Sequence, residues 1–75
     1  MYIVEVVREV EDGGGYTAFN YSIDGITDNL ENARRMASDY LKNSMDNSVV
    51  FIQATYCPVN SGVTNQITTL WEASE

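Results

Sequence analysis

Histidine is absent from this 75-residue chain, and cysteine and proline each occur only once. The chain therefore lacks the commonest general base and the commonest metal ligand. Cys57 has neither a second cysteine to pair with nor a histidine to activate it, so we expect an inert thiol in a reducing compartment. No apolar run approaches the roughly 20 residues of a membrane span. These absences predict a cytoplasmic protein with no membrane partner, no metal site and no cofactor.

Basic residues are also scarce. The chain has 4 Lys and Arg against 11 Asp and Glu, which gives a net charge of −7. Binding to a phosphate backbone draws on clustered basic residues, so we do not expect direct nucleic-acid binding. An acidic surface suits either plain solvation or a basic protein partner. The length predicts a single domain, residues 1–75, whose small core a dimer would supplement.

The first part of the chain predicts a β-hairpin. From Tyr2 to Glu11 the side chains alternate with the period of a strand. One face carries Tyr2, Val4, Val6 and Val10, and the other carries Ile3, Glu5, Val7, Glu9 and Glu11. The glycines of "EDGGG" favour a loop. A second strand follows from about Tyr16 to Ile23, and "IDGI" predicts the tight turn that ends it.

A helix is predicted next, from about residue 29 to residue 45. Asp28 is the expected N-cap, and Glu31 completes a capping-box pattern. Helical spacing predicts a buried stripe made of Leu30, Ala33, Ala37, Tyr40, Leu41 and Ser44. Two further strands are expected in "NSVVFIQATYC" and "VTNQITTLW". Their predicted inward residues are Val50, Ile52, Ala54 and Tyr56 in the first, and Val63, Ile67 and Trp71 in the second.

The predicted fold class is α+β, a four-stranded, mostly antiparallel sheet with one helix packed on one face (ββαββ). One helix cannot cover both faces of such a sheet. The uncovered side is expected to carry the acidic face of the first strand together with Phe51 and Leu70. Most of the other aromatic residues are expected to be core, namely Tyr2, Phe19, Tyr21, Tyr40, Tyr56 and Trp71. Tyr16 lies beside the glycines and suits an exposed anchor.

No segment predicts an active site. "DGGGY" lacks the Lys-Ser/Thr of a phosphate loop and joins two strands. Glu9 and Glu11 share a strand face about 6.6–6.8 Å apart, but an exposed strand offers no pocket to shift either pKa. We therefore predict that the protein is not an enzyme.

The same spacing has another use, since it is similar to the step between phosphates in an extended nucleic-acid strand. A row formed by Glu5, Glu9, Glu11 and Asp12 would compete for a cationic groove that normally holds DNA or RNA. The plain alternative is that these acids form a solvated strand face.

Two stretches, "YIVEVVREVE" and the helical "ARRMAS" of Ala33 to Ser38, resemble small phage-encoded anti-CRISPR proteins over about half of the chain. The resemblance implies a non-enzymatic inhibitor in the cytoplasm of an infected bacterium, which binds a CRISPR–Cas effector complex and blocks target DNA. It also implies that the basic pair Arg34 and Arg35 grips the effector. Where the comparison would want another cation this chain has Asp39, which favours acidic contacts.

Two alternatives stay open. Arg34 and Arg35 also fit a solvated, salt-bridged helix face, on which Arg35 has Glu31 and Asp39 at i,i+4 spacing. The whole chain also fits a small self-associating domain, in which the open face or a strand at the sheet's margin pairs between copies.

Overall fold

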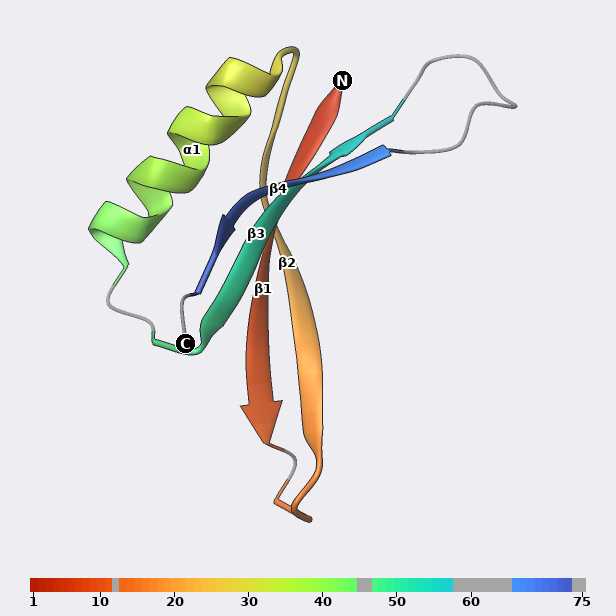
Figure 1. Cartoon of the computed structure of the whole chain (residues 1–75), viewed down its shortest axis with the longest axis vertical. Coiled ribbons are helices and arrows are strands. Elements are labelled where there is room, and N and C mark those ends of the chain that lie inside the picture. The colour runs from red at the N-terminus through yellow and green to blue at the C-terminus, as the bar shows by residue number, and fades with distance from the viewer. Residues whose placement is uncertain (12, 45–46, 58–65, 74–75) are drawn as a thin grey trace.

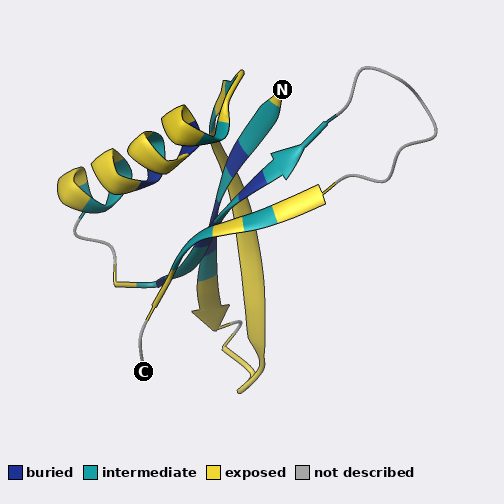
Figure 2. Cartoon of the chain, turned by 45° about the horizontal axis from the view of Figure 1, so that its top comes forward, coloured by how far each residue is buried: buried dark blue, intermediate teal, exposed yellow. Residues whose placement is uncertain are grey.

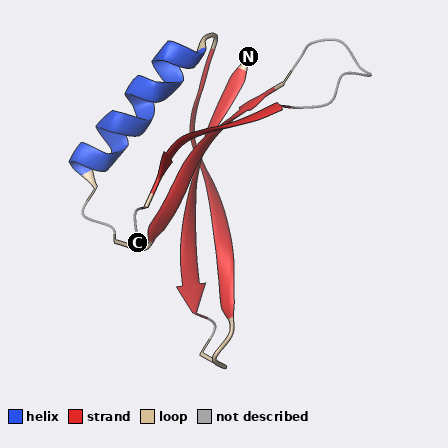
Figure 3. Cartoon of the chain, viewed as in Figure 1, coloured by secondary structure: helices blue, strands red, loops and turns tan. Residues whose placement is uncertain are grey.

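The computed structural model describes residues 1–11, 13–44, 47–57 and 66–73. It confirms the predicted ββαββ order (Figures 1 and 3). The elements are β1 Tyr2–Glu11, β2 Thr17–Thr27, α1 Leu30–Asn43, β3 Val49–Tyr56 and β4 Gln66–Glu72. The sheet has the order β2-β1-β3-β4, and all neighbouring strands are antiparallel. Helix α1 lies across one face of this sheet.

The core lies between α1 and the sheet, where Figure 2 shows the buried residues. Its buried members are Val4, Val6, Ala33, Ala37, Val49, Ile52 and Ala54. The helix contributes the two alanines, whose small side chains let its backbone approach the valines and isoleucine of the strands. Leu30, Tyr40 and Leu41 pack around them, so these members of the predicted stripe are confirmed. Ser44 is not a member, because it follows the last helical residue as the C-cap, and Met36 packs on the core although the spacing did not predict it.

The helix begins one residue later than predicted. Asn29, not Asp28, is the N-cap, because its side-chain Oδ1 accepts the backbone N–H of Asn32 at 2.8 Å. At the other end the helix stops at Asn43, and the Ser44 N–H donates to the Tyr40 carbonyl at 2.9 Å. Asp and Asn cap helices about equally well, so the exit of the chain from β2 decides between them.

The predicted turn at "IDGI" is wrong, because β2 continues through it to Thr27. Asp24 is instead an extra residue, since Val4 pairs with Gly25 and Glu5 pairs with Ile23. A β-bulge of this kind absorbs one residue without reversing the chain. Gly25 then faces α1, where a Cβ would lie 2.5 Å from Cε of Met36. Glycine at this position therefore lets the helix side chain lie directly against the strand.

A second bulge changes the inward residues of β3. Val7 pairs with Phe51 and Arg8 with Val49, which leaves Val50 as the extra residue. The core position that simple alternation assigns to Val50 is therefore occupied by Val49, which is buried. Ile52 and Ala54 are buried as predicted.

A third bulge separates two residues of β4 that alternation places together. Ile52 pairs with Trp71 and Gln53 with Thr69, so Leu70 is the extra residue. Trp71 packs against the core as predicted, but Ile67 lies on the opposite face and is 62% exposed. Leu70, expected on the uncovered side, also packs against the core. The predicted inward residue Val63 lies outside the described residues.

Candidate interaction surface

The face of the sheet that points away from α1 is not covered by any described element. We call it the open face. Its membership follows from the strand register, because paired residues direct their side chains to the same side. It comprises Ile3, Glu5, Val7, Glu9 and Glu11 of β1, Thr17, Phe19, Tyr21, Ile23 and Ile26 of β2, Phe51, Gln53 and Thr55 of β3, and Ile67, Thr69 and Glu72 of β4.

Large apolar side chains are exposed on the open face. Phe19 and Tyr21 are each 56% exposed, and the isoleucines at 23, 26 and 67 are similarly exposed. Figure 2 shows β2 exposed over almost its whole length. The prediction that Phe19 and Tyr21 belong to the core is wrong, because pairing places them opposite Glu9 and Val7, on the side that the helix does not reach. A monomer rarely exposes such a patch unless it binds something.

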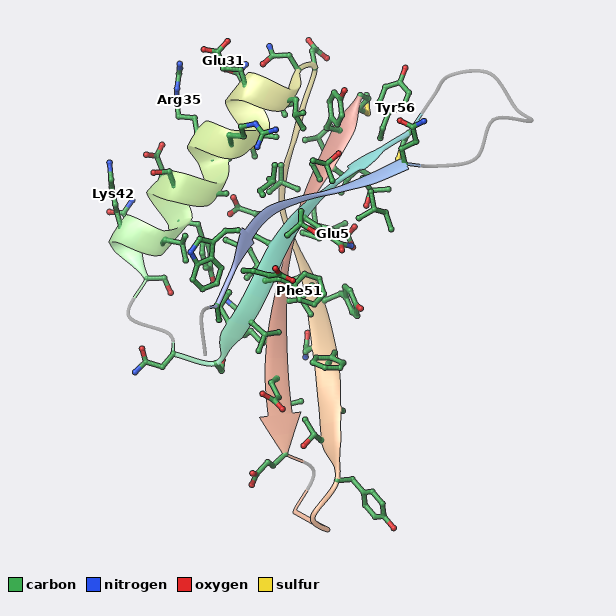
Figure 4. The ribbon with its side chains drawn as sticks, in the orientation of Figure 1. Glu5, Glu31, Arg35, Lys42, Phe51 and Tyr56 are labelled. Carbon is green, nitrogen blue, oxygen red and sulfur yellow. The ribbon has the colours of Figure 1, made fainter. Side chains whose placement is uncertain are left out.

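One residue of the open face, Val7, is buried beneath its neighbours. Val7 is 0% exposed although it points away from the helix. It pairs with Tyr21 on one side and with Phe51 on the other. The rings of Tyr21 and Phe51 pack edge to face with centroids 6.4 Å apart. The two rings therefore meet above the valine and form a small apolar cluster of their own (Phe51 is labelled in Figure 4).

The acids of β1 occupy two kinds of environment. Glu5 is half-buried, and its Oε1 accepts the hydroxyl of Thr55 at 2.9 Å and the side-chain amide of Gln53 at 3.4 Å. Glu9 and Glu11 are exposed, on the part of the hairpin that extends beyond α1 (Figure 1). Of the acidic row that the sequence predicts, these two are thus presented to solvent. Asp12 lies outside the described residues.

All four basic residues lie on the other side of the molecule. Arg8 points toward α1, where its guanidinium carbon lies 5.6 Å from the ring centroid of Tyr40. Arg34, Arg35 and Lys42 belong to α1, and Figure 4 shows Arg35 and Lys42 directed away from the sheet. The structure therefore separates the predicted acidic contacts of β1 from the predicted basic contacts of α1. The open face carries carboxylates and no cation.

Two other predicted site residues lie apart from the open face. Tyr16, immediately before β2, is 74% exposed, as predicted. Asp39 is exposed on α1 and lines a hollow of about 360 Å³ between the helix and β2. The remaining lining residues are Asp24, Met36, Tyr40, Asn43 and Ser44.

Neither metal-binding nor membrane-spanning features occur in the described part of the chain. Among residues 1–11, 13–44, 47–57 and 66–73, no three Cys, Asp or Glu side chains lie close enough together to hold a metal ion. Within the same ranges, α1 is too short and too polar to cross a bilayer. Cys57 is a free, half-buried thiol whose Sγ lies 3.8 Å from the carbonyl oxygen of Thr55.

Comparisons with protein-family models, with curated proteins and with solved structures found no match to this chain. A function is therefore inferred from the open face. Sequence reasoning found its acids but missed its apolar members on β2 and β4. Pairing the second strand against the first would have placed Phe19, Tyr21 and Ile23 beside the acids, on the uncovered side.

Proposed function

We propose that this protein is a non-enzymatic binding protein that uses the open face against a cationic protein partner. In its most specific form, it is a phage-type inhibitor that binds a CRISPR–Cas effector in the cytoplasm of the infected bacterium and blocks target DNA. The observation that carries the proposal is the segregation of charge: exposed apolar groups and carboxylates share a face that has no cation.

The composition of this face suits arginine and lysine side chains. Glu9 pairs across the strands with Phe19, so a carboxylate lies next to an exposed aromatic ring. A guanidinium bonds to a carboxylate and stacks on an aromatic ring, and its aliphatic stem covers apolar surface. An effector groove that holds a nucleic-acid backbone is rich in such side chains.

The spacing of the acids supports the nucleic-acid-related form of the proposal. Glu9 and Glu11 are two residues apart on a regular strand, which separates them by about 6.6–6.8 Å. Both are exposed on a hairpin that extends away from the body of the domain (Figure 1). Both carboxylates therefore lie beyond the part of the sheet that α1 covers, where a cationic groove can reach them.

A tagged pull-down from lysates of bacteria with defined CRISPR systems tests the proposal. We expect an effector complex to be recovered, and its binding to target DNA to fall when the protein is added. Glu9→Gln with Glu11→Gln should reduce recovery about tenfold, because two complementary charges are lost from the contact.

Matched variants separate the acidic hairpin from the helix. Asp28→Asn with Glu31→Gln removes the same two negative charges from the −7 total, at exposed positions outside the open face, and should leave recovery unchanged. Arg34→Ala with Arg35→Ala tests the basic grip. Loss of binding in the arginine variant alone would contradict the open-face contact, and recovery of no effector from any lysate would contradict the CRISPR form of the proposal.

A further inference from the structure

Strand β2 forms one margin of the described sheet, because its only strand neighbour is β1. It is 11 residues long, and in Figure 1 its N-terminal half extends, together with β1, beyond α1, β3 and β4. A long strand at a sheet margin presents backbone N–H and C=O groups that can pair with a further strand. The residues that present these groups follow from the ladder of hydrogen bonds.

The direction of the backbone groups in β1 is set by two hydrogen bonds to the β3 side. Glu9 donates its N–H to the Ser48 carbonyl at 2.9 Å, and the Met1 carbonyl accepts the Cys57 N–H at 2.8 Å. Because backbone groups alternate in direction along a strand, the N–H and C=O groups of the odd-numbered residues of β1 point toward β3. The N–H and C=O groups of the even-numbered residues therefore point toward β2.

The same alternation continues into β2. Arg8 pairs with Asn20, so the even-numbered residues of this part of β2 bond to β1. The odd-numbered residues direct their N–H and C=O groups outward, and they are Thr17, Phe19, Tyr21 and Ile23. Their side chains belong to the open face, so one row of residues offers both backbone bonds and apolar contacts.

Nothing in this half of β2 opposes pairing with another strand. Residues 17–23, "TAFNYSI", contain no charged residue and no proline, and their pairing with β1 is regular up to the bulge at Asp24. The opposite margin differs, since β4 is 7 residues long and has a bulge at Leu70 and a carboxylate at Glu72. Charges and bulges at a margin are the usual protection against strand pairing. Protection is therefore present at β4 and missing from the N-terminal half of β2.

We propose that two copies of this chain associate through residues 17–23 of β2, antiparallel to each other, to form a continuous eight-stranded sheet. The occupant is a second copy because the segment is self-complementary. Although the chain has a net charge of −7, residues 17–23 carry no charge, so two copies can approach along this segment without repulsion between like charges. This inference goes beyond the partner-binding proposal and does not depend on it.

The register between the two copies of β2 follows if all four outward residues form hydrogen-bonded pairs and the bulge at Asp24 stays unpaired. Thr17 then pairs with Ile23 of the second copy, Phe19 pairs with Tyr21, and the two Asn20 residues lie opposite each other on the two-fold axis. Four hydrogen-bonded pairs supply about eight backbone hydrogen bonds. Two aromatic pairs become cross-strand neighbours, an arrangement that stabilises antiparallel sheets.

This association also places both open faces on the same side. The two-fold axis is perpendicular to the sheet, so both helices lie together on the other side. The two copies of β1 are separated by three strand spacings, about 14 Å. The dimer thus presents the exposed Glu9 and Glu11 twice on one surface.

Sedimentation of the full chain across a range of concentrations tests the proposal. We expect a species of twice the 8.4 kDa chain mass. Asn20→Lys puts two like charges on the axis and should raise the dimer dissociation constant about a hundredfold. Asn20→Glu should do the same. An equimolar mixture of the two variants should restore a heterodimer, because the opposed charges then attract.

A second variant guards against a change that merely disturbs the fold. Phe19→Pro removes an outward N–H, which β1 does not use, so circular dichroism should stay native while association is lost. A chain that stays monomeric at all concentrations overturns the proposal. So does a dimer that persists in both charge variants and in Phe19→Pro, because the contact then lies elsewhere.

Discussion

Replacing Val7 by alanine is expected to destabilise the domain by about 2 kcal/mol, although this residue faces away from the helix. The side chain is 0% exposed, since the rings of Tyr21 and Phe51 cover it. Removing two buried methylene equivalents costs about 1.6 kcal/mol at 0.8 kcal/mol each, and the cavity left beneath the rings adds to this.

Two valines of the same strand serve as controls. Val4 is 0% exposed beneath α1, and Val4→Ala should cost about as much as Val7→Ala. Val10 is 40% exposed, so Val10→Ala should cost about 1 kcal/mol or less. Urea unfolding followed by Trp71 fluorescence measures all three, at one low protein concentration. For a domain of this size, 2 kcal/mol corresponds to roughly 8–16 °C in melting temperature.

A double-mutant cycle with Phe51→Ala tests the cause. Removing that ring opens the site to water, so Val7→Ala should cost about 0.5–1 kcal/mol less in the Phe51→Ala background. If Val7→Ala costs no more than Val10→Ala, or if the two substitutions are additive, the cluster above Val7 does not exist as described.

Three further changes test local features by urea unfolding. Asn29→Ala should lower the free energy of unfolding by about 1 kcal/mol because it removes the N-cap, whereas Asp28→Ala should lower it clearly less. The opposite order would show that Asp28 is the N-cap, as the sequence alone predicts. Gly15→Ala should cost about 1 kcal/mol because the backbone φ is +85°, and Gly15→Asn should cost less because asparagine tolerates positive φ; equal costs would contradict this conformation. Arg8→Met should lose about 0.5–1 kcal/mol of cation–π attraction, and the loss should vanish in a Tyr40→Leu background; an unchanged loss would assign the effect to other contacts.

Local patterns were sufficient to predict the secondary structure. Strand alternation, helical spacing and loop glycines depend on neighbouring residues, and they predicted four strands, one helix and their order. The helical stripe that contains Ala33 and Ala37 was confirmed for the same reason. Prediction failed at "IDGI", because Asp-Gly fits a turn and a bulge equally well until the partner strand is known.

The candidate interaction surface could be predicted only in part. The sequence identified Glu9 and Glu11 as acids on one strand face, and both residues are exposed to solvent in the structure. It did not identify Phe19 and Tyr21 as surface residues, since an aromatic residue in a strand is usually core. Which side of β2 the helix covers depends on pairing with β1.

The sequence by itself determined the acidic charge, the lack of histidine, the alternation of β1 and the apolar stripe of α1, because each is a property of residue identity and short spacing. Tertiary structure decided which residues share a face. Each bulge shifts the alternation of its strand by one residue, and the shift is defined only by the strand opposite. That is why Ile67 and Trp71 lie on opposite sides and why Val49 replaces Val50 in the core. The pairing of β2 with β1 decided that the apolar side chains of β2 share a face with the carboxylates of β1.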